Sequence, residues 1–315
     1  MPGRVGTGFA PDGGGVNEGG MDLRAAPRVE NLSRTDTKKP VKLAEETLGV
    51  SMHRIFFVAA AVCAALTGAA SAQAPGEGYY ALTLGVSNIA DKEITGRLKA
   101  PFVTGEGGGI PSGVNLPVDT VYEFDTDYDP GVFVGLTMGK ASNYGPFRSE
   151  LEISYSRNSV NGHSDITLLG EDVSGDDLAL FTGAETPTGT TVGQVFADGR
   201  GRLITYTAML NFFWDIPVPA ERVRPFVGIG GGASIIDVDF GPSGVDIVSH
   251  QDTVLAYQAI VGASYQISDK LTLSTAFRMR DTSEAEFATD REFLDSELKF
   301  DTTQANLEIT LRRMF

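Results

Sequence analysis

The sequence contains a single cysteine, three histidines, and far fewer basic than acidic side chains. Cys63 alone excludes an intramolecular disulfide framework. The formal net charge of −16 argues against a nucleic-acid partner, because binding of phosphates needs a basic surface. With 38 glycines and 42% hydrophobic residues, the 315-residue chain is also predicted to be neither disordered nor a helical bundle.

Long hydrophobic runs are scarce too, and the most apolar stretch lies in residues 52–72. It begins MHRIFF, with His53 and Arg54 before the apolar run, and ends in the small-residue site Ala70-Ser71-Ala72. This pattern predicts a secretory signal peptide, whose apolar run is too short for a membrane-spanning helix. We expect residues 1–51, which are polar and glycine-rich, to be a gene-start artefact or a disordered leader.

The exported part is then expected to be residues 73–315, which carry 17 basic and 34 acidic side chains. No apolar run in this part reaches the roughly 18 residues of a transmembrane helix. An exported chain of this kind is therefore either soluble or a β-barrel.

Strict alternation of apolar and polar residues is clearest in Val254–Arg280. In its first half, an apolar row that includes Leu255, Tyr257 and Val261 alternates with small or polar residues. After the turn at residues 268–270 the alternation resumes. Two strands of roughly 10 residues joined by a tight turn have the length that crosses a bilayer in a tilted β-barrel.

Eight such segments follow one another along the chain. They are Tyr79–Ser87, Gly131–Gly139, Phe147–Ser156, Arg202–Trp214, Arg224–Ile235, the two halves of Val254–Arg280, and Thr302–Phe315. Long polar connections at 88–130, 157–201, 237–251 and 281–301 alternate with short turns. This alternation predicts an all-β fold, an eight-stranded antiparallel up-and-down transmembrane barrel with external loops and periplasmic turns.

The polar row of each segment separates a membrane barrel from a soluble one. Gly228, Gly230 and Gly232 would weaken the outside of a soluble barrel, whereas inside a narrow barrel they leave room for long side chains from other strands. Charged residues on the same row are expected to pair across the lumen, because an unpartnered buried charge is costly. The predicted lumen network consists of Arg148, Glu150, Glu152, Arg278, Arg280, Glu308 and Arg312.

The C-terminal segment carries a separate signal. Its apolar row ends at the terminal aromatic residue and is similar to the terminal strand that the bacterial barrel-assembly machinery recognises. The predicted assembly signal consists of Leu307, Ile309, Leu311 and Phe315.

Four stretches resemble one protein family. They are FDTDYDPGVFVGLTMG (124–139), FRSELEISYSRN (147–158), AMLNFFWDIPVPAERVRPFVGIGGG (208–232) and AYQAIVGASYQISDKLTLSTAFRMR (256–280). The chain resembles the eight-stranded outer-membrane β-barrels grouped with opacity-type and rickettsial surface antigens, an OmpA-type barrel without a periplasmic domain. The resemblance implies a Gram-negative outer-membrane location, but no single activity, since members include surface antigens, adhesins and porin-like proteins.

Residues that could carry chemistry are few. Some eight-stranded barrels modify lipid A with His and Ser, so His163-Ser164-Asp165 is a candidate, but neighbours on an extended chain point to opposite sides, and a solvated loop histidine is the default. Asp125, Asp127 and Asp129 have the spacing that opens an EF-hand loop, yet Pro130 and Leu136 replace its Gly and bidentate Glu. We predict no catalytic, cofactor or metal site.

Acidic residues are concentrated in the last long connection. The densest acidic cluster, in the last connection, is expected to be a solvated rim, with recruitment of divalent cations beside lipopolysaccharide as the alternative. Its members are Glu284, Glu286, Asp290, Glu292, Asp295 and Glu297.

The sequence therefore predicts a non-enzymatic outer-membrane protein, a structural anchor that displays acidic loops for envelope integrity or surface contact. A small porin-like channel with an Arg/Glu-lined lumen is the alternative, and a lipid A-modifying enzyme is a third possibility. Expected partners are outer-membrane lipid and lipopolysaccharide, the barrel-assembly machinery, and a surface ligand that the sequence does not identify.

Overall fold

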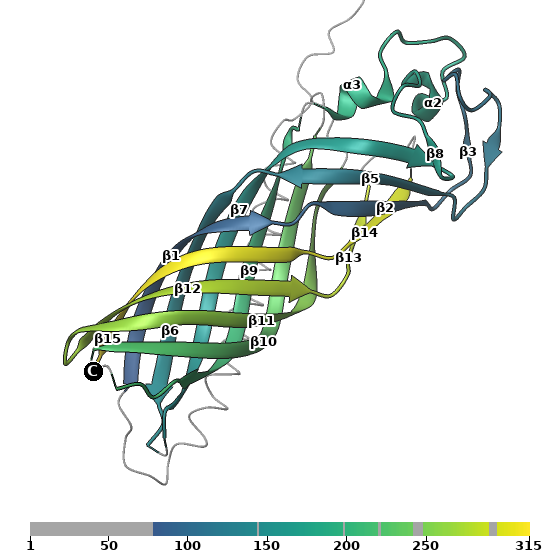
Figure 1. Cartoon of the computed structure of the whole chain (residues 1–315). Helices are drawn as coiled ribbons and strands as arrows, with labels where there is room; N and C mark the ends of the chain where they lie inside the picture. The colour runs from purple at the N-terminus through teal and green to yellow at the C-terminus, as the bar shows by residue number, and fades with distance from the viewer. Residues whose placement is uncertain (1–77, 144, 198, 220–221, 242–247, 290–294) are drawn as a thin grey trace, which may run out of the picture. The chain divides into compact units, whose positions relative to one another are not determined.

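The computed structural model describes residues 78–315, except 144, 198, 220–221, 242–247 and 290–294 (Figure 1). The predicted leader, residues 1–51, and the predicted signal peptide, residues 52–72, lie outside the described residues.

Eight antiparallel strands close into a barrel (Figure 1). Each strand pairs with the next one around the barrel, and the last strand pairs with the first, so that Leu84 stands opposite Ile309. The strands are β1 (Gly78–Ile89), β6 (Gly131–Ala141), β7 (Phe147–Leu168), β9 (Gly201–Asp215), β10 (Val223–Phe240), β11 (Val248–Ser268), β12 (Leu271–Thr282) and β15 (Thr303–Met314). The predicted eight-stranded antiparallel barrel is confirmed.

An apolar belt surrounds this barrel. Leu84 and Ile309 are 55% and 60% exposed, and Leu255 on β11 is 71% exposed. Such a continuous row of exposed large apolar side chains would be unfavourable in water, whereas it suits contact with lipid. No helix among the described residues is long and apolar enough to span a membrane.

The long connections are not the polar loops that the sequence analysis expected. They form a second sheet, the outer sheet, that continues from the end of the barrel opposite the C-terminus (Figure 1). Its strands are β2 (Lys92–Leu98), β5 (Val121–Tyr128), β13 (Ala285–Ala288) and β14 (Ser296–Phe300), joined to the extension of β7.

Smaller elements complete this end. They are the hairpin of β3 (Phe102–Val103) and β4 (Asn115–Leu116), strand β8 (Glu171–Asp172), and helices α2 (Ala179–Thr182) and α3 (Val192–Phe196).

Strand β10 shows why the sequence predicted polar loops where the structure continues as strands. In its first half Ile229 points outward and is 68% exposed, while Gly228 and Gly230 face inward. In its second half the same inward row carries Ile236 and Val238, both 0% exposed, and the outward row ends in Asp237 and Asp239. The alternation thus continues along β10, but the apolar row moves from the outward face to the inward face. A search for strands with an apolar outward face therefore stops at this exchange point.

The interior of the outer sheet is a hydrophobic core. Aromatic and aliphatic side chains from several connections pack there, among them Ile94, Leu168, Leu203, Ile236, Val238, Phe240, Phe287 and Leu298. Burial of this core offsets the entropy cost of ordering the long connections. The outer sheet is therefore folded structure in its own right.

Candidate functional site

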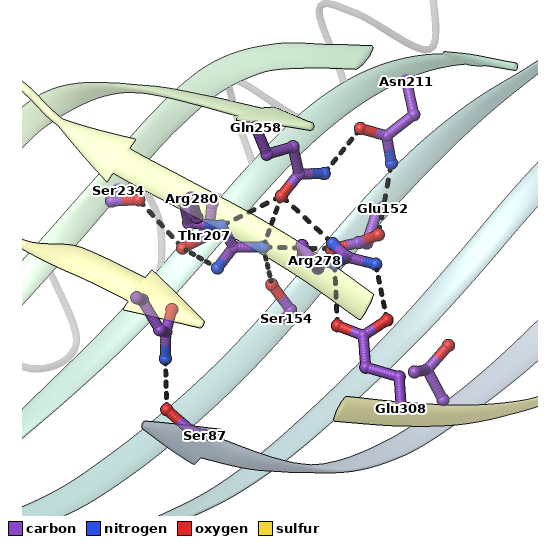
Figure 2. A network of polar contacts seen from close by, with 12 residues as sticks. Ser87, Glu152, Ser154, Thr207, Asn211, Ser234, Gln258, Arg278, Arg280 and Glu308 are labelled. Atoms are coloured by element: carbon purple, nitrogen blue, oxygen red, sulfur yellow. Dashed lines mark hydrogen bonds and ion pairs between the residues drawn. The ribbon is translucent and has the colours of Figure 1, made fainter. Parts of the chain in front are cut away.

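Four charged side chains from three strands meet inside the barrel and form what we call the inner cluster (Figure 2). Arg278 donates from Nη1 to Glu152 Oε1 (2.5 Å) and from Nη2 to Glu308 Oε2 (3.0 Å). Arg280 donates from Nη2 to the same Glu152 oxygen (3.2 Å). All four are at most 4% exposed, and two positive charges balance two negative ones, as burial of charge requires.

Neutral polar side chains add further hydrogen bonds to the inner cluster. Gln258 Oε1 accepts from Arg280 Nε (3.0 Å), and Gln258 Nε2 donates to Asn211 Oδ1 (2.7 Å). Asn211 Nδ2 in turn donates to Glu152 Oε2 (3.2 Å). Gly230 makes this arrangement possible, because a Cβ at that position would overlap the Asn211 amide.

A second group, the turn-end cluster, lies nearer the short turns. Arg148 pairs with Glu150 and donates from Nε to Asp215 Oδ1 (3.1 Å), while the Tyr79 hydroxyl donates to Glu150 Oε1 (2.7 Å). Arg312 Nη2 is 4.0 Å from Glu150 Oε1. The guanidinium of Arg148 also stacks 3.8 Å from the centre of the Phe213 ring.

The structure thus brings the seven predicted lumen residues together in two clusters instead of one. Among the described residues, no hydrogen bond or ion pair joins the inner cluster to the turn-end cluster. Sequence reasoning missed Tyr79, Asn211, Asp215 and Gln258. Of these, Asn211 and Gln258 were on the polar rows of their segments, so their phase was a usable signal.

The space between the two clusters is almost filled. A void of about 30 Å³ remains, lined by Glu150, Glu152, Glu308 and their neighbours. This is room for about two water molecules. Beyond the inner cluster, toward the outer sheet, the hydrophobic core follows.

His163 does not lie in a solvated loop, contrary to the default expectation. It is 7% exposed in the extension of β7, and its Nδ1 is 2.8 Å from Thr126 Oγ1. The rings of Phe124 and Phe240 each stand edge-on to it at 5.3 Å. Ser164 is exposed on the opposite face, so the two side chains are not arranged as nucleophile and base.

Two acidic side chains of the predicted cluster form ion pairs with lysines in the outer sheet. Glu286 and Glu297 both pair with Lys299, and Glu297 also pairs with Lys99. These hydrogen bonds from Lys99 and Lys299 lower the pKa of Glu297. Asp290 and Glu292 lie outside the described residues. Across the described ranges no group of three or more His, Cys, Asp or Glu side chains could hold a metal ion.

The predicted assembly residues lie together on the outside of the barrel. Leu307, Ile309, Leu311 and Phe315 are each at least 45% exposed, and the Phe315 ring stacks on Tyr80 with centroids 4.6 Å apart. They form the last stretch of the apolar belt on β15.

A closed barrel with a lipid-facing belt and a charged, filled interior defines the class: an eight-stranded outer-membrane β-barrel protein. Residues 119–305 match the family described as "Surface antigen", and the chain belongs to this family. The predicted recognition and the outer-membrane location are thereby confirmed.

Comparisons with individual proteins add little. No curated protein matches the sequence. Neisserial surface protein A is 11% identical, with a TM-score of 0.37, over 75% of this chain and 97% of that chain. OprG from Pseudomonas aeruginosa is 10% identical, with a TM-score of 0.45, over 76% and 96%. The outer membrane protease OmpT from Escherichia coli is 9% identical, with a TM-score of 0.38, over 76% and 97%. At such low TM-scores the three likenesses carry no argument about this chain.

Proposed function

We propose that the protein is a non-enzymatic surface protein whose barrel anchors the outer sheet for envelope integrity or surface contact. In bacterial barrels the short turns face the periplasm and the long connections face outward. In this orientation the outer sheet, α2 and α3 are displayed outside the cell.

The continuity of the strands carries the proposal. Strand β7 has 22 residues, which at ~3.3 Å per residue extend for about 70 Å. A tilted strand needs only about 9–11 residues to cross a bilayer. Roughly half of β7 therefore lies beyond the lipid, where it pairs with β5 and supports the outer sheet on the rigid barrel.

The far end of the outer sheet is held by contacts between two separate connections. Gly105 N donates to Leu180 O (3.2 Å), Glu106 N donates to Ala184 O (2.9 Å), and Asp177 N donates to Gly107 O (2.8 Å). The β3–β4 hairpin is thus joined to the α2 segment by main-chain hydrogen bonds. Such a joined tip suits a contact surface, because little ordering entropy is lost when a preorganised surface binds.

The test has two parts. A short epitope inserted at Gly113, which has a φ of +76° and open space beside it, is expected to be labelled on intact cells. The control epitope at Asp269-Lys270 is expected to be labelled only after lysis. Replacing residues 102–116 with a short Gly/Ser turn is then expected to reduce cell adhesion or resistance to detergent and EDTA, while heat-modifiable migration on gels persists. Unchanged adhesion and resistance would contradict the proposed role.

The burial of His163 supports the non-enzymatic part of the proposal. A lipid A-modifying activity that used this histidine would need it accessible beside a nucleophile. Mass spectra of lipid A are expected to be the same with the wild type, with His163→Ala and with an empty vector. Modified lipid A that disappears with His163→Ala would establish the enzyme instead.

A further inference from the structure

A vestibule opens at the turn end of the barrel, which is the periplasmic end in the orientation proposed above. Its volume is about 270 Å³, near the lower limit for small-molecule sites, which is about 300 Å³. Four arginines line it, Arg148, Arg222, Arg224 and Arg312, against the two carboxylates Asp215 and Asp269. The lining therefore has an excess of positive charge in a protein whose formal net charge is −16.

Two of these arginines have donors that the protein does not use. Arg148 Nη2 and Arg312 Nε are buried and have no hydrogen-bond partner among the described residues. The side chains of Arg148 and Arg312 are 3% and 11% exposed, so leaving donors unpaired there is costly. Arg148 is held in place by its pair with Glu150 and by its stacking on Phe213.

The other two arginines stand at the rim. Arg222 and Arg224 are exposed, and among the described residues neither forms an ion pair. Their main chain is fixed by the barrel, since Gln266 N donates to Arg222 O (2.9 Å) and Arg224 pairs in register with Ser264. The vestibule thus combines buried arginines inside with exposed arginines at its rim, and guanidinium groups bind phosphate oxygens well.

We propose that the vestibule is a binding site for a phosphate group. The guanidinium groups of Arg148 and Arg312 line its inner part, and the exposed Arg222 and Arg224 supply positive charge for the anion at the rim. The phosphate has two possible sources, the headgroup of an anionic phospholipid in the periplasmic leaflet and a free phosphate in the periplasm. No role in catalysis is involved.

The test uses the folded full-length barrel in octyl glucoside, a detergent without phosphate. Inorganic phosphate is titrated by calorimetry and by ³¹P line broadening, and saturable binding is expected. Arg222→Ala/Arg224→Ala, which leaves the buried clusters intact, is expected to bind about tenfold more weakly, equivalent to about 1.4 kcal/mol. Arg200→Ala/Arg202→Ala removes the same charge at the other end and is expected to change the affinity less than about twofold.

Nanodiscs separate the two sources. If inorganic phosphate binds in phosphatidylcholine discs but is displaced in phosphatidylglycerol discs, the ligand is the lipid headgroup. If the affinity is the same in both, the ligand is a free anion. Both results support the site. Absence of saturable binding by the wild type in octyl glucoside, or equal weakening by the two double variants, would overturn it.

Discussion

Replacing Glu152 with alanine is expected to destabilise the barrel more than any other single change in its interior. Glu152 accepts hydrogen bonds from Arg278, Arg280 and Asn211. Without it, Arg278 retains Glu308, but Arg280 retains only neutral acceptors such as Gln258. Removing one partner from a buried pair costs about 3–5 kcal/mol, and two guanidinium groups lose a partner here, so we expect the upper end of that range.

The assay is equilibrium unfolding by urea in lipid vesicles, followed by the fluorescence of Trp214, the only tryptophan. Glu152→Gln retains an acceptor oxygen at the same position and is expected to cost less than Glu152→Ala. Glu171→Ala, an exposed carboxylate on β8, is the matched control and is expected to change stability by no more than about 0.5 kcal/mol.

A variant with all four charged residues replaced tests whether charge compensation causes the destabilisation by Glu152→Ala. Replacing all four residues of the inner cluster with methionine removes every charge at similar volume, and is expected to be neutral or stabilising. If Glu152→Ala loses less than about 1 kcal/mol, or if the methionine variant is the less stable of the two, the interpretation of the cluster as mutually compensating charges is wrong.

Three further results are expected. Ile229→Lys places a charge in lipid and should cost about 2–4 kcal/mol, whereas Asp237→Lys, on the same face of β10 but beyond the exchange point, should cost about 0.5 kcal/mol or less. Equal effects in vesicle unfolding would refute the exchange of faces. Desolvation raises the pKa of Asp177, but hydrogen bonds from the main chain of Ala179 and from Thr188 outweigh it and bring the pKa to about 2. The contribution of the Asp177 carboxylate to stability is therefore complete above about pH 4 and is lost as the pH falls toward 2. Asp177→Asn at pH 7 should increase hydrogen exchange in residues 176–191. In planar bilayers the wild type should show at most small, infrequent conductance, which Arg278→Ala should increase; large steady wild-type channels would contradict a filled lumen.

The barrel strands could be predicted because each has to satisfy lipid on one side and a crowded interior on the other. That requirement fixes a period of two, and Leu255, Tyr257 and Val261 follow it without exception. The same phase argument placed Glu152, Arg278 and Glu308 inside the barrel, because only the interior offers a charged side chain its partners.

The outer sheet could not be recognised in this way. Its strands bury Phe124 and Tyr128 while Asp125 and Asp127 face outward, so an average over the segment is polar. The alternation was visible in the sequence, but the apolar partners of these residues, such as Phe240, come from distant connections. Local composition cannot show that such residues meet in one core.

By itself, then, the sequence determined the number of barrel strands, their phase and the charge of the lumen, since these follow from the alternation along each strand. Only the tertiary structure decided how the charges divide into two clusters, that His163 lies in an aromatic core, and that Arg148 and Arg312 border a vestibule. Those outcomes depend on which residues of neighbouring strands stand opposite one another, and the shear of a closed barrel sets that register.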